Sequence, residues 1–279
     1  MSKRYVFRVG VFSAIILVFA QFSVAETVDN WQLFSTVASG GGSYYPDTFV
    51  SVNPQTGEMT MRGAQGATPQ QFAIDMDPIS GFLFGTDGYS RPGVITRIDP
   101  SNGQWTETTG ILEGAHLVNL TSLSFSPNGT LYGISDYKTL GIIDLGMGTF
   151  SSIAELDIPG DVYGMDFSPQ GTLYFVESYG RDETYQQWLR TVSVSTGEIT
   201  STLSTGEYTS GDIDFAPDGY IYHTNFSWYL FKMDPATAEQ TMVGFGGFGP
   251  FGGIASVPEP ATLLLLGLGG PIVSRLRKK

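Results

Sequence analysis

Cysteine is absent from this chain of 279 residues, and histidine occurs only twice, as His116 and His223. Without cysteine the chain cannot form disulfides, thiolate metal sites or iron–sulfur clusters, and it has no cysteine nucleophile. Two histidines are hardly enough for the His₂ or His₃ ligand sets of catalytic zinc sites. A folded domain in this chain therefore holds together by packing and hydrogen bonds alone.

Basic residues are also scarce between the two ends. Residues 26–256 contain seven Lys and Arg against 26 Asp and Glu, a net charge of −19. Nucleic acids and anionic lipids need basic residues to neutralise their phosphates, so this charge argues against both as partners. It favours solubility, divalent cations or basic partners. Aromatic residues make up 13% of the chain, which is enough to build a hydrophobic core.

The N-terminal end has the order of an export signal. Three basic residues precede the apolar run Val9–Ala20, and the small residues Ser23–Ala25 follow it. This order predicts a signal peptide over residues 1–25, removed by signal peptidase, so that the mature chain begins at Glu26. The alternative is an uncleaved anchor, which the short apolar run disfavours because a spanning helix needs about 20 residues.

The C-terminal end has three parts: a Pro-rich motif, the apolar run Ala261–Val273 and the basic tail Ser274–Lys279. The motif consists of Val257, Pro258, Glu259 and Pro260. This order resembles the PEP-CTERM sorting signal of exported bacterial proteins, and we expect residues 257–279 to form such a signal. The resemblance implies recognition and processing by an exosortase, a Gram-negative host, and a cell-surface or biofilm-matrix setting.

The C-terminal apolar run is short for a permanent membrane anchor. As a helix it is roughly 20 Å long, against roughly 30 Å for the hydrocarbon core. Its glycines and Pro271 weaken it further as a helix. We therefore expect transient membrane contact. The basic flank of each apolar run faces away from the centre of the chain, so the positive-inside rule places residues 26–256 outside the inner membrane.

The middle segment is a repeat array without sustained helical periodicity. One unit, apolar-x-apolar-x-Pro followed by a glycine turn and a second strand, has its prolines at Pro78, Pro127, Pro169 and Pro217, spaced by 49, 42 and 48 residues. A second unit, strand-turn-strand, occurs at Val52–Gly57, Ile98–Gly103, Ile143–Gly148, Val194–Gly197 and Met233–Thr237. Alternating apolar residues with Pro, Asn and Gly at the turns are typical of strands joined by hairpins.

These repeats predict an all-β fold, a five-bladed β-propeller over residues 26–256, because a repeat of 40–50 residues accommodates the four strands of one blade. Six blades are the alternative, and two short hydrophobic targeting helices are expected to flank the propeller. Leu33–Val37 resembles the second strand of a repeat and Gly253–Ser256 resembles the first. We expect these two segments to pair and to close the ring.

Antiparallel order sorts the connections between two faces. The turns after the first and third strands of each blade share one face and are short, whereas the other connections share the opposite face and are long, as at residues 107–120 and 178–187. Long loops usually carry the binding surface. Both targeting segments would leave from the short-turn face, so the hypothesis is that the long-loop face points outward.

Three tyrosines recur at equivalent places on the predicted long-loop face, with acidic residues beside them. The tyrosines are Tyr89, Tyr137 and Tyr179, and their acidic neighbours are Asp87, Asp136 and Glu177. Flat rings beside carboxylates suit stacking and hydrogen bonding on a polysaccharide. The alternative interpretation is that the rings cover blade edges.

Asp75, Asp166 and Asp214 occupy one repeat position, three residues before the proline. They could surround the central axis and hold Ca²⁺, which prefers carboxylate and carbonyl oxygens. The alternative is that each aspartate bonds amides of a turn or a neighbouring strand. Apart from Ca²⁺, the sequence implies no cofactor.

The sequence favours a non-enzymatic function, that of a binding or scaffold module for exopolysaccharide or a surface protein. The alternative is a Ca²⁺-dependent hydrolase or lyase acting at the channel mouth. No Gly-x-Ser-x-Gly nucleophile elbow is present. The enzyme alternative needs several carboxylates around one metal, whereas the binding module needs a broad aromatic and polar face.

Overall fold

The computed structural model describes residues 31–38, 47–66, 69–87, 91–108, 110–180, 186–206, 211–224 and 228–258. These residues form strands and turns, with no helix among them. The two expected targeting helices lie outside the described residues.

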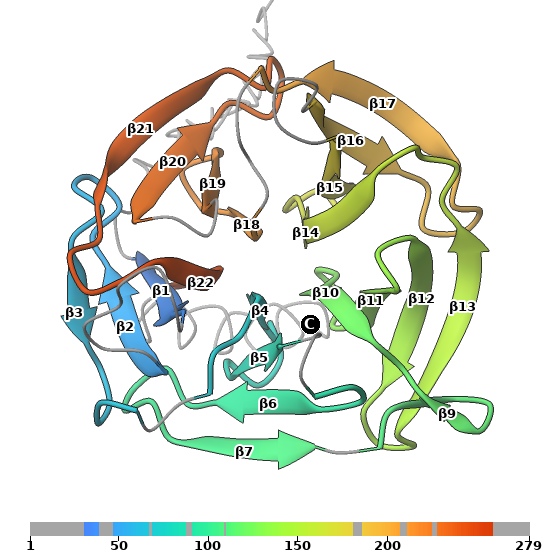
Figure 1. Cartoon of the computed structure of the whole chain (residues 1–279), viewed down its shortest axis with the longest axis horizontal. Coiled ribbons are helices and arrows are strands. Elements are labelled where there is room, and N and C mark those ends of the chain that lie inside the picture. Colours follow the sequence, from blue (N-terminus) through green and yellow to red (C-terminus); the bar gives the residue numbers. More distant parts are fainter. Residues whose placement is uncertain are drawn as a thin grey trace, which may run out of the picture.

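Five sheets surround a common axis, each with its first strand innermost (Figure 1). Blade 1 contains β22 (Phe251–Pro258), β1 (Trp31–Val37), β2 (Thr48–Val52) and β3 (Met59–Met61). Blade 2 contains β4 (Ala73–Met76), β5 (Leu83–Thr86), β6 (Ile95–Ile98) and β7 (Trp105–Thr108). Blade 3 contains β10 (Leu120–Phe125), β11 (Leu131–Ser135), β12 (Thr139–Asp144) and β13 (Thr149–Glu155).

Blade 4 contains β14 (Asp161–Phe167), β15 (Leu173–Tyr179), β16 (Gln186–Val192) and β17 (Ile199–Ser204). Blade 5 contains β18 (Ile213–Phe215), β19 (Ile221–Thr224), β20 (Tyr229–Met233) and β21 (Gln240–Phe245). A small hairpin of β8 (Leu112–Glu113) and β9 (His116–Leu117) extends the outer edge of blade 3. The prediction of a five-bladed propeller is confirmed.

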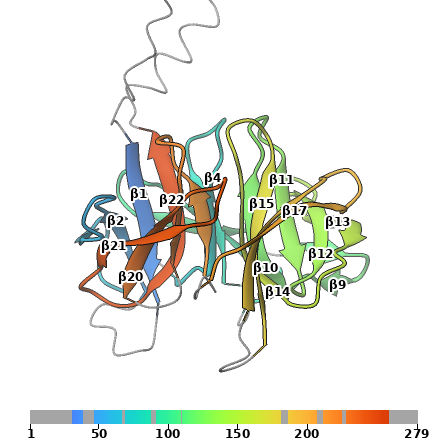
Figure 2. The same ribbon diagram turned by 90° about the horizontal axis from the view of Figure 1, so that it is seen from above.

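The closing strand β22 pairs with β1, as the sequence predicts. Leu33 faces Ser256 and Ser35 faces Ile254 in an antiparallel register. The Ser35 hydroxyl also donates a hydrogen bond to the Gly253 carbonyl at 2.8 Å. Figure 2 shows the ring from the side, with β1 and β22 next to each other.

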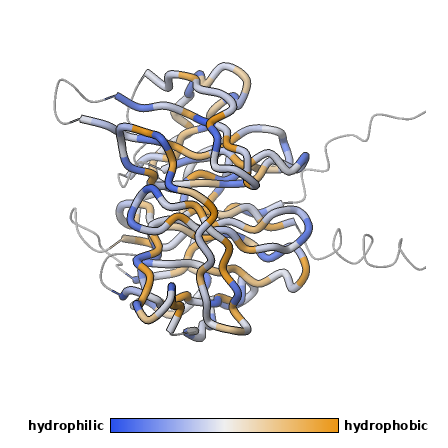
Figure 3. Tube along the Cα trace, turned by 90° about the vertical axis from the view of Figure 1, so that its right-hand side faces the viewer, coloured by the Kyte–Doolittle hydropathy of each residue, from blue (hydrophilic) through white to orange (hydrophobic). Residues whose placement is uncertain are grey.

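Hydrophobic side chains fill the spaces between neighbouring blades. One cluster joins Leu33 and Ile254 of blade 1 to Tyr222 and Leu230 of blade 5. Another joins blade 1 to blade 2 and includes Val257 of β22. Figure 3 shows the hydrophobic residues interspersed with polar ones along the strands, which is the pattern of sheets whose faces pack on neighbours. Packing between blades therefore takes the place of the absent disulfides.

The repeated turns owe their shape to glycine and to Asx hydrogen bonds. In the turn after the first strand, Gly129 and Gly171 have φ of 86° and 84°, a conformation that favours glycine. In the turn after the third strand, the Asp99 carboxylate accepts the Ser101 N–H at 2.9 Å, and Asp234 accepts that of Ala236 at 2.7 Å. The recurring motifs of the sequence are these turns.

One connection on the predicted long-loop face is short. Blade 3 turns from β11 to β12 through Asp136 and Tyr137, and the Lys138 N–H bonds the Ser135 carbonyl at 3.1 Å. Both turn residues have positive φ, 47° and 65°. Three residues, 136–138, separate the paired Ser135 and Thr139, and the positive φ of the first two is that of a tight hairpin turn, where glycine or asparagine is usual. The expectation of long loops is therefore wrong for this blade.

Candidate functional site

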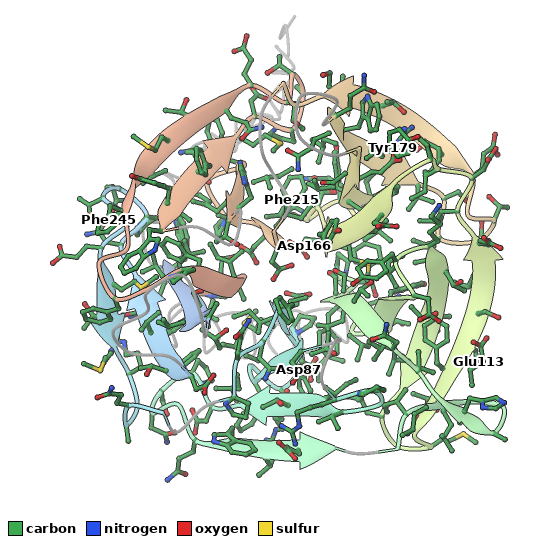
Figure 4. The ribbon with its side chains drawn as sticks, in the orientation of Figure 1. Asp87, Glu113, Asp166, Tyr179, Phe215 and Phe245 are labelled. Atoms are coloured by element: carbon green, nitrogen blue, oxygen red, sulfur yellow. The ribbon has the colours of Figure 1, made fainter. Side chains whose placement is uncertain are left out.

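The aspartates of the repeat position lie on the innermost strands and face the axis. Asp75, Ser124, Asp166 and Asp214 come from β4, β10, β14 and β18, and we call these four residues the axial ring. Figure 4 shows Asp166 near the axis of the propeller. Ala255 of β22 occupies the equivalent place in blade 1, so the ring has one position without a polar side chain.

Each polar side chain of the axial ring accepts a backbone N–H from the next blade. Asp75 Oδ2 accepts the Phe125 N–H at 2.5 Å, and Asp166 Oδ2 accepts the Phe215 N–H at 2.6 Å. Asp214 bonds Ser256 of the closing strand in the same way. These hydrogen bonds fit the alternative interpretation of the sequence, in which each aspartate bonds the amide of a neighbouring strand. They join the innermost strands of successive blades.

Ser124 joins two carboxyl groups of the axial ring. Its hydroxyl lies 2.9 Å from Asp75 Oδ2 and 2.7 Å from Asp166 Oδ1. A hydroxyl has a single proton to donate, so both contacts are hydrogen bonds only if one of the carboxyl groups is protonated and donates to Ser124. With one carboxyl group protonated, Ser124 of blade 3 joins Asp75 of blade 2 to Asp166 of blade 4.

The carboxyl groups of the axial ring have raised pKa values, which favours a protonated carboxyl group. Burial, followed by the charge of Asp214, raises the pKa of Asp75 from 3.8 to about 7. Burial raises the pKa of Asp214 to about 6. The pKa of Asp166 is raised well above its usual value, first by burial and then by the charge of Asp75.

Asp212, just before β18, accepts hydrogen bonds from the backbone of two other blades. Its Oδ2 accepts the Ile74 N–H of blade 2 and the Ile254 N–H of the closing strand, both at 2.9 Å. Burial raises the pKa of this carboxyl well above its usual value. Asp212 thus holds the closing strand to the blades on both of its sides.

Within the described part of the chain, no group of three or more His, Asp or Glu residues has an arrangement that could hold a metal ion. Asp75, Asp166 and Asp214 do lie around one axis, as the sequence predicts. Both oxygens of Asp75 and of Asp166 accept amide hydrogen bonds, whereas Asp214 Oδ2 is buried without a hydrogen-bond partner, and the Ca²⁺ hypothesis stays a prediction.

The two histidines have different surroundings. His223 is fully buried in β19 and stacks on Phe231 with ring centroids 5.1 Å apart. Burial lowers its pKa to about 3, so its ring stays neutral at physiological pH. His116 lies exposed in β9 on the outer edge of blade 3.

The predicted tyrosine surface is only partly described. Tyr89 lies outside the described residues. Tyr137 is half-buried and its ring tilts against Tyr163, with centroids 5.6 Å apart. Tyr179 is 51% exposed at the end of β15. The described tyrosines thus differ in how much ring they offer to a ligand.

The acidic neighbours of these tyrosines also differ. Glu177 is fully buried and accepts hydrogen bonds from the Gly160 N–H at 2.6 Å and the Arg190 side chain at 2.5 Å. Asp136 is exposed and accepts a 3.3 Å hydrogen bond from Asn119, while Asp87 is half-buried. Glu177 is therefore committed to an internal ion pair, and sequence spacing alone could not reveal that its side chain points inward.

An exposed aromatic groove lies on blade 5. Of its residues, the sequence points only to Trp228, as an aromatic residue in or beside a long loop. It has a volume of about 420 Å³ and is lined by Trp228, Tyr229, Phe245 and Gly247. The rings of Trp228 and Phe245 are stacked 5.3 Å apart with 4° between their planes, and Tyr229 meets Phe245 edge-on at 5.7 Å. Tyr229 and Phe245 are 42% and 50% exposed.

The paired ends of β20 and β21 position the rings of this aromatic groove. The pairing of β20 with β21 shifts register between Leu230 and Phe231, next to Tyr229. The Gly246 N–H bonds the Trp228 carbonyl at 2.8 Å, which fixes the indole beside the end of β21. Figure 4 shows Phe245 at the outer rim, far from the axial ring. The available sequence signal was the Phe- and Gly-rich run from Gly244 to Gly249.

A larger hollow, of about 610 Å³, lies between blades 1 and 2. Its lining includes Phe82, Arg97 and Trp105. The Arg97 guanidinium lies 3.4 Å from the centre of the Phe82 ring, so it covers one face of that ring. The aromatic groove of blade 5 offers more uncovered ring surface.

The C-terminal residues match a known sorting signal. Residues 256–278 fit the family model described as the PEP-CTERM protein-sorting motif. The chain carries a PEP-CTERM motif. This motif indicates an exported protein that an exosortase processes and that is anchored at the cell envelope through its C-terminus. In the portion of the chain that the structure describes, no helix is long and apolar enough to cross a bilayer.

Solved structures with a similar fold are distant in sequence. TolB from Acinetobacter baumannii has a TM-score of 0.50 and 12% identity, over 82% of this chain and 67% of TolB. Hydrazine synthase of Kuenenia stuttgartiensis has a TM-score of 0.41 and 19% identity, over 62% of this chain and 49% of its own. Virginiamycin B lyase from Staphylococcus aureus has a TM-score of 0.41 and 14% identity, over 71% of this chain and 63% of the lyase.

The chain thus spans about half the length of the hydrazine synthase chain. At these identities the similarities concern the fold alone. No curated protein matches the chain significantly in sequence.

Proposed function

We propose that this exported propeller binds extracellular polysaccharide through the aromatic groove of Trp228, Tyr229 and Phe245. The propeller fold suits a binding or scaffold module, and the sorting motif carries the protein to the cell envelope. The observation that supports the polysaccharide is the stack of Trp228 on Phe245 with Tyr229 edge-on, in which Phe245 and Tyr229 are about half-exposed. Sugar rings present apolar C–H faces that pack on such surfaces.

The charge of the domain narrows the class of polymer. Residues 26–256 carry a net charge of −19, which repels uronate-rich or phosphate-bearing chains. A neutral or amine-bearing polysaccharide avoids that repulsion. We infer that this is the class that the aromatic groove binds.

The position of the aromatic groove fits the proposed role. Tyr229 begins a third strand and Phe245 ends a fourth strand, so both lie on the face opposite the turns after the first strand. Pro258, where the described chain meets the sorting motif, ends a first strand and lies on the turn side. Pro258 and the groove therefore lie on opposite faces, which fits a groove that points away from the membrane.

Retention on immobilised polysaccharides tests the proposal. A glycan array with neutral, amine-bearing and acidic polymers should show retention on the first two classes. Replacing Phe245 or Trp228 with alanine should weaken retention about tenfold, because a stacked ring contributes about 1 kcal/mol or somewhat more. Phe245→Tyr is the matched control and should retain binding. Unchanged retention after Trp228→Ala and Phe245→Ala together, in a folded protein, would refute the proposal.

Tyr137 and Tyr179 remain a second candidate for the same ligand class, because Tyr179 is half-exposed on the same face as the groove. The same array with Tyr179→Ala separates the two surfaces. The Ca²⁺-dependent hydrolase or lyase remains an alternative prediction, and a metal-content measurement on the purified protein tests it.

A further inference from the structure

The closing strand of the propeller and the sorting motif overlap in sequence. β22 spans Phe251–Pro258, whereas the PEP-CTERM match begins at residue 256. Val257 faces Gln32 and Pro258 faces Trp31 in the register of β22 with β1. The first two residues of the motif therefore belong to blade 1.

Val257 is also part of the hydrophobic core. Its side chain is 8% exposed and lies in the cluster with Phe34 of β1 and Ile74 of blade 2. Ser256, one residue earlier, donates a 3.2 Å hydrogen bond to the Phe215 carbonyl of blade 5. The end of β22 thus contacts three blades.

We propose that the exosortase cleaves on the C-terminal side of Pro258, so that the processed protein keeps Val257 and Pro258 as the last residues of its closing strand. A protease binds its substrate as an extended, accessible strand. Val257 is buried and its backbone is engaged in the register with β1, so the bonds around it are protected while the ring is closed. β22 lies at the inner edge of its sheet and pairs there with β1. Cleavage before Val257 would also remove two of the residues that pair with β1, Val257 and Pro258.

This assignment divides the motif between two tasks. Its first two residues complete the fold, and the remaining residues are left for recognition by the processing enzyme. The ring can therefore be closed both before and after processing. The inference rests on the sorting motif and the closing strand, and it is independent of polysaccharide binding.

Mass spectrometry of the processed chain tests the proposal. The protein is expressed in cells with an active exosortase, together with an unrelated PEP-CTERM protein as a processing control, and its C-terminal peptide is sequenced. The expected C-terminus is Pro258 or a later residue. A C-terminus at Val257 or earlier would overturn the proposal, and so would an uncut chain in cells that process the control.

A pair of variants links the cleavage point to the fold. Val257→Asp introduces a buried charge that should detach the end of β22 and expose upstream bonds, so shorter C-termini should rise about tenfold or more in abundance. Val257→Ile keeps a β-branched apolar side chain and should give the wild-type terminus. If both variants gave the wild-type terminus, although circular dichroism shows that Val257→Asp loosens the fold, pairing of β22 would not protect these bonds.

Discussion

The axial ring and the aromatic groove differ in repetition as well as in position. The axial ring uses one repeat position in four blades, its residues are buried or half-buried, and their oxygens accept hydrogen bonds from the next blade. The aromatic groove lies on blade 5, where Tyr229 and Phe245 are about half-exposed at the paired ends of β20 and β21. In this propeller, repeated polar residues build the ring, whereas the proposed binding surface arises where blade 5 has Tyr229 paired with Phe245 and the equivalent places of blade 3 have Thr139 and Glu155.

The largest expected effect on stability is that of replacing Asp212, which should destabilise the closed ring and leave the groove unchanged. Asp212→Ala leaves the buried Ile74 and Ile254 N–H groups without their acceptor, and each unpaired group costs about 1–3 kcal/mol. We expect the free energy of unfolding to fall by about 2–5 kcal/mol in urea titrations. Asp212→Asn keeps one acceptor and should lose less. Equal stability of Asp212→Ala and the wild type would mean that Asp212 does not hold the closing strand.

The second expected effect is a fall in stability as the pH rises. The folded pKa of Asp75 is about 7, above its unfolded value of 3.8, so the folded state binds the proton more strongly. The resulting stabilisation is complete below about pH 4 and is lost as the pH rises through about 7. We expect the melting temperature to be higher at pH 5 than at pH 8.

The matched variant for this pH dependence is Asp75→Asn, which cannot ionise. The difference in melting temperature between pH 5 and pH 8 should shrink in this variant. The same difference in variant and wild type would show that other carboxylates of this acidic domain cause the pH effect.

A smaller effect is expected from the bridging hydroxyl. Ser124→Ala removes the contacts to Asp75 and Asp166 and should cost about 1–2 kcal/mol in the free energy of unfolding. Ser124→Thr keeps the hydroxyl and should retain most of this stability. Retention on polysaccharide should be the same for both variants, measured at a temperature where both are folded.

The smallest effect on stability is expected at the groove. Phe245→Ala removes a ring that is half-exposed and should change the free energy of unfolding by less than about 1 kcal/mol. The same substitution should lower polysaccharide retention about tenfold. If this variant lost stability and binding in parallel, Phe245 would be a packing residue. The groove would then stabilise the fold as the axial ring does, and the contrast between the two regions would be wrong.

Repetition explains which features of this protein could be predicted from its sequence. The five blades and the pairing of Leu33–Val37 with Gly253–Ser256 follow from motifs that recur with their turns. The inward direction of Glu177 does not follow, because the partner Arg190 comes from a neighbouring strand and only the register brings the two together. The groove depends on the pairing of Tyr229 with Phe245, two residues 16 apart in the sequence that only the register of β20 with β21 brings together.

The two strands that close the ring, β1 and β22, lie far apart along the chain, and this separation has a consequence for folding. Ser35 bonds Gly253, which lies 218 residues later. Contacts of such high sequence separation form slowly, because the whole intervening chain loses conformational freedom before they stabilise it. During export from the N-terminus, the edge of β1 has no partner until the final strand has crossed the membrane, so a slow last folding phase and a need for chaperones outside the membrane are expected.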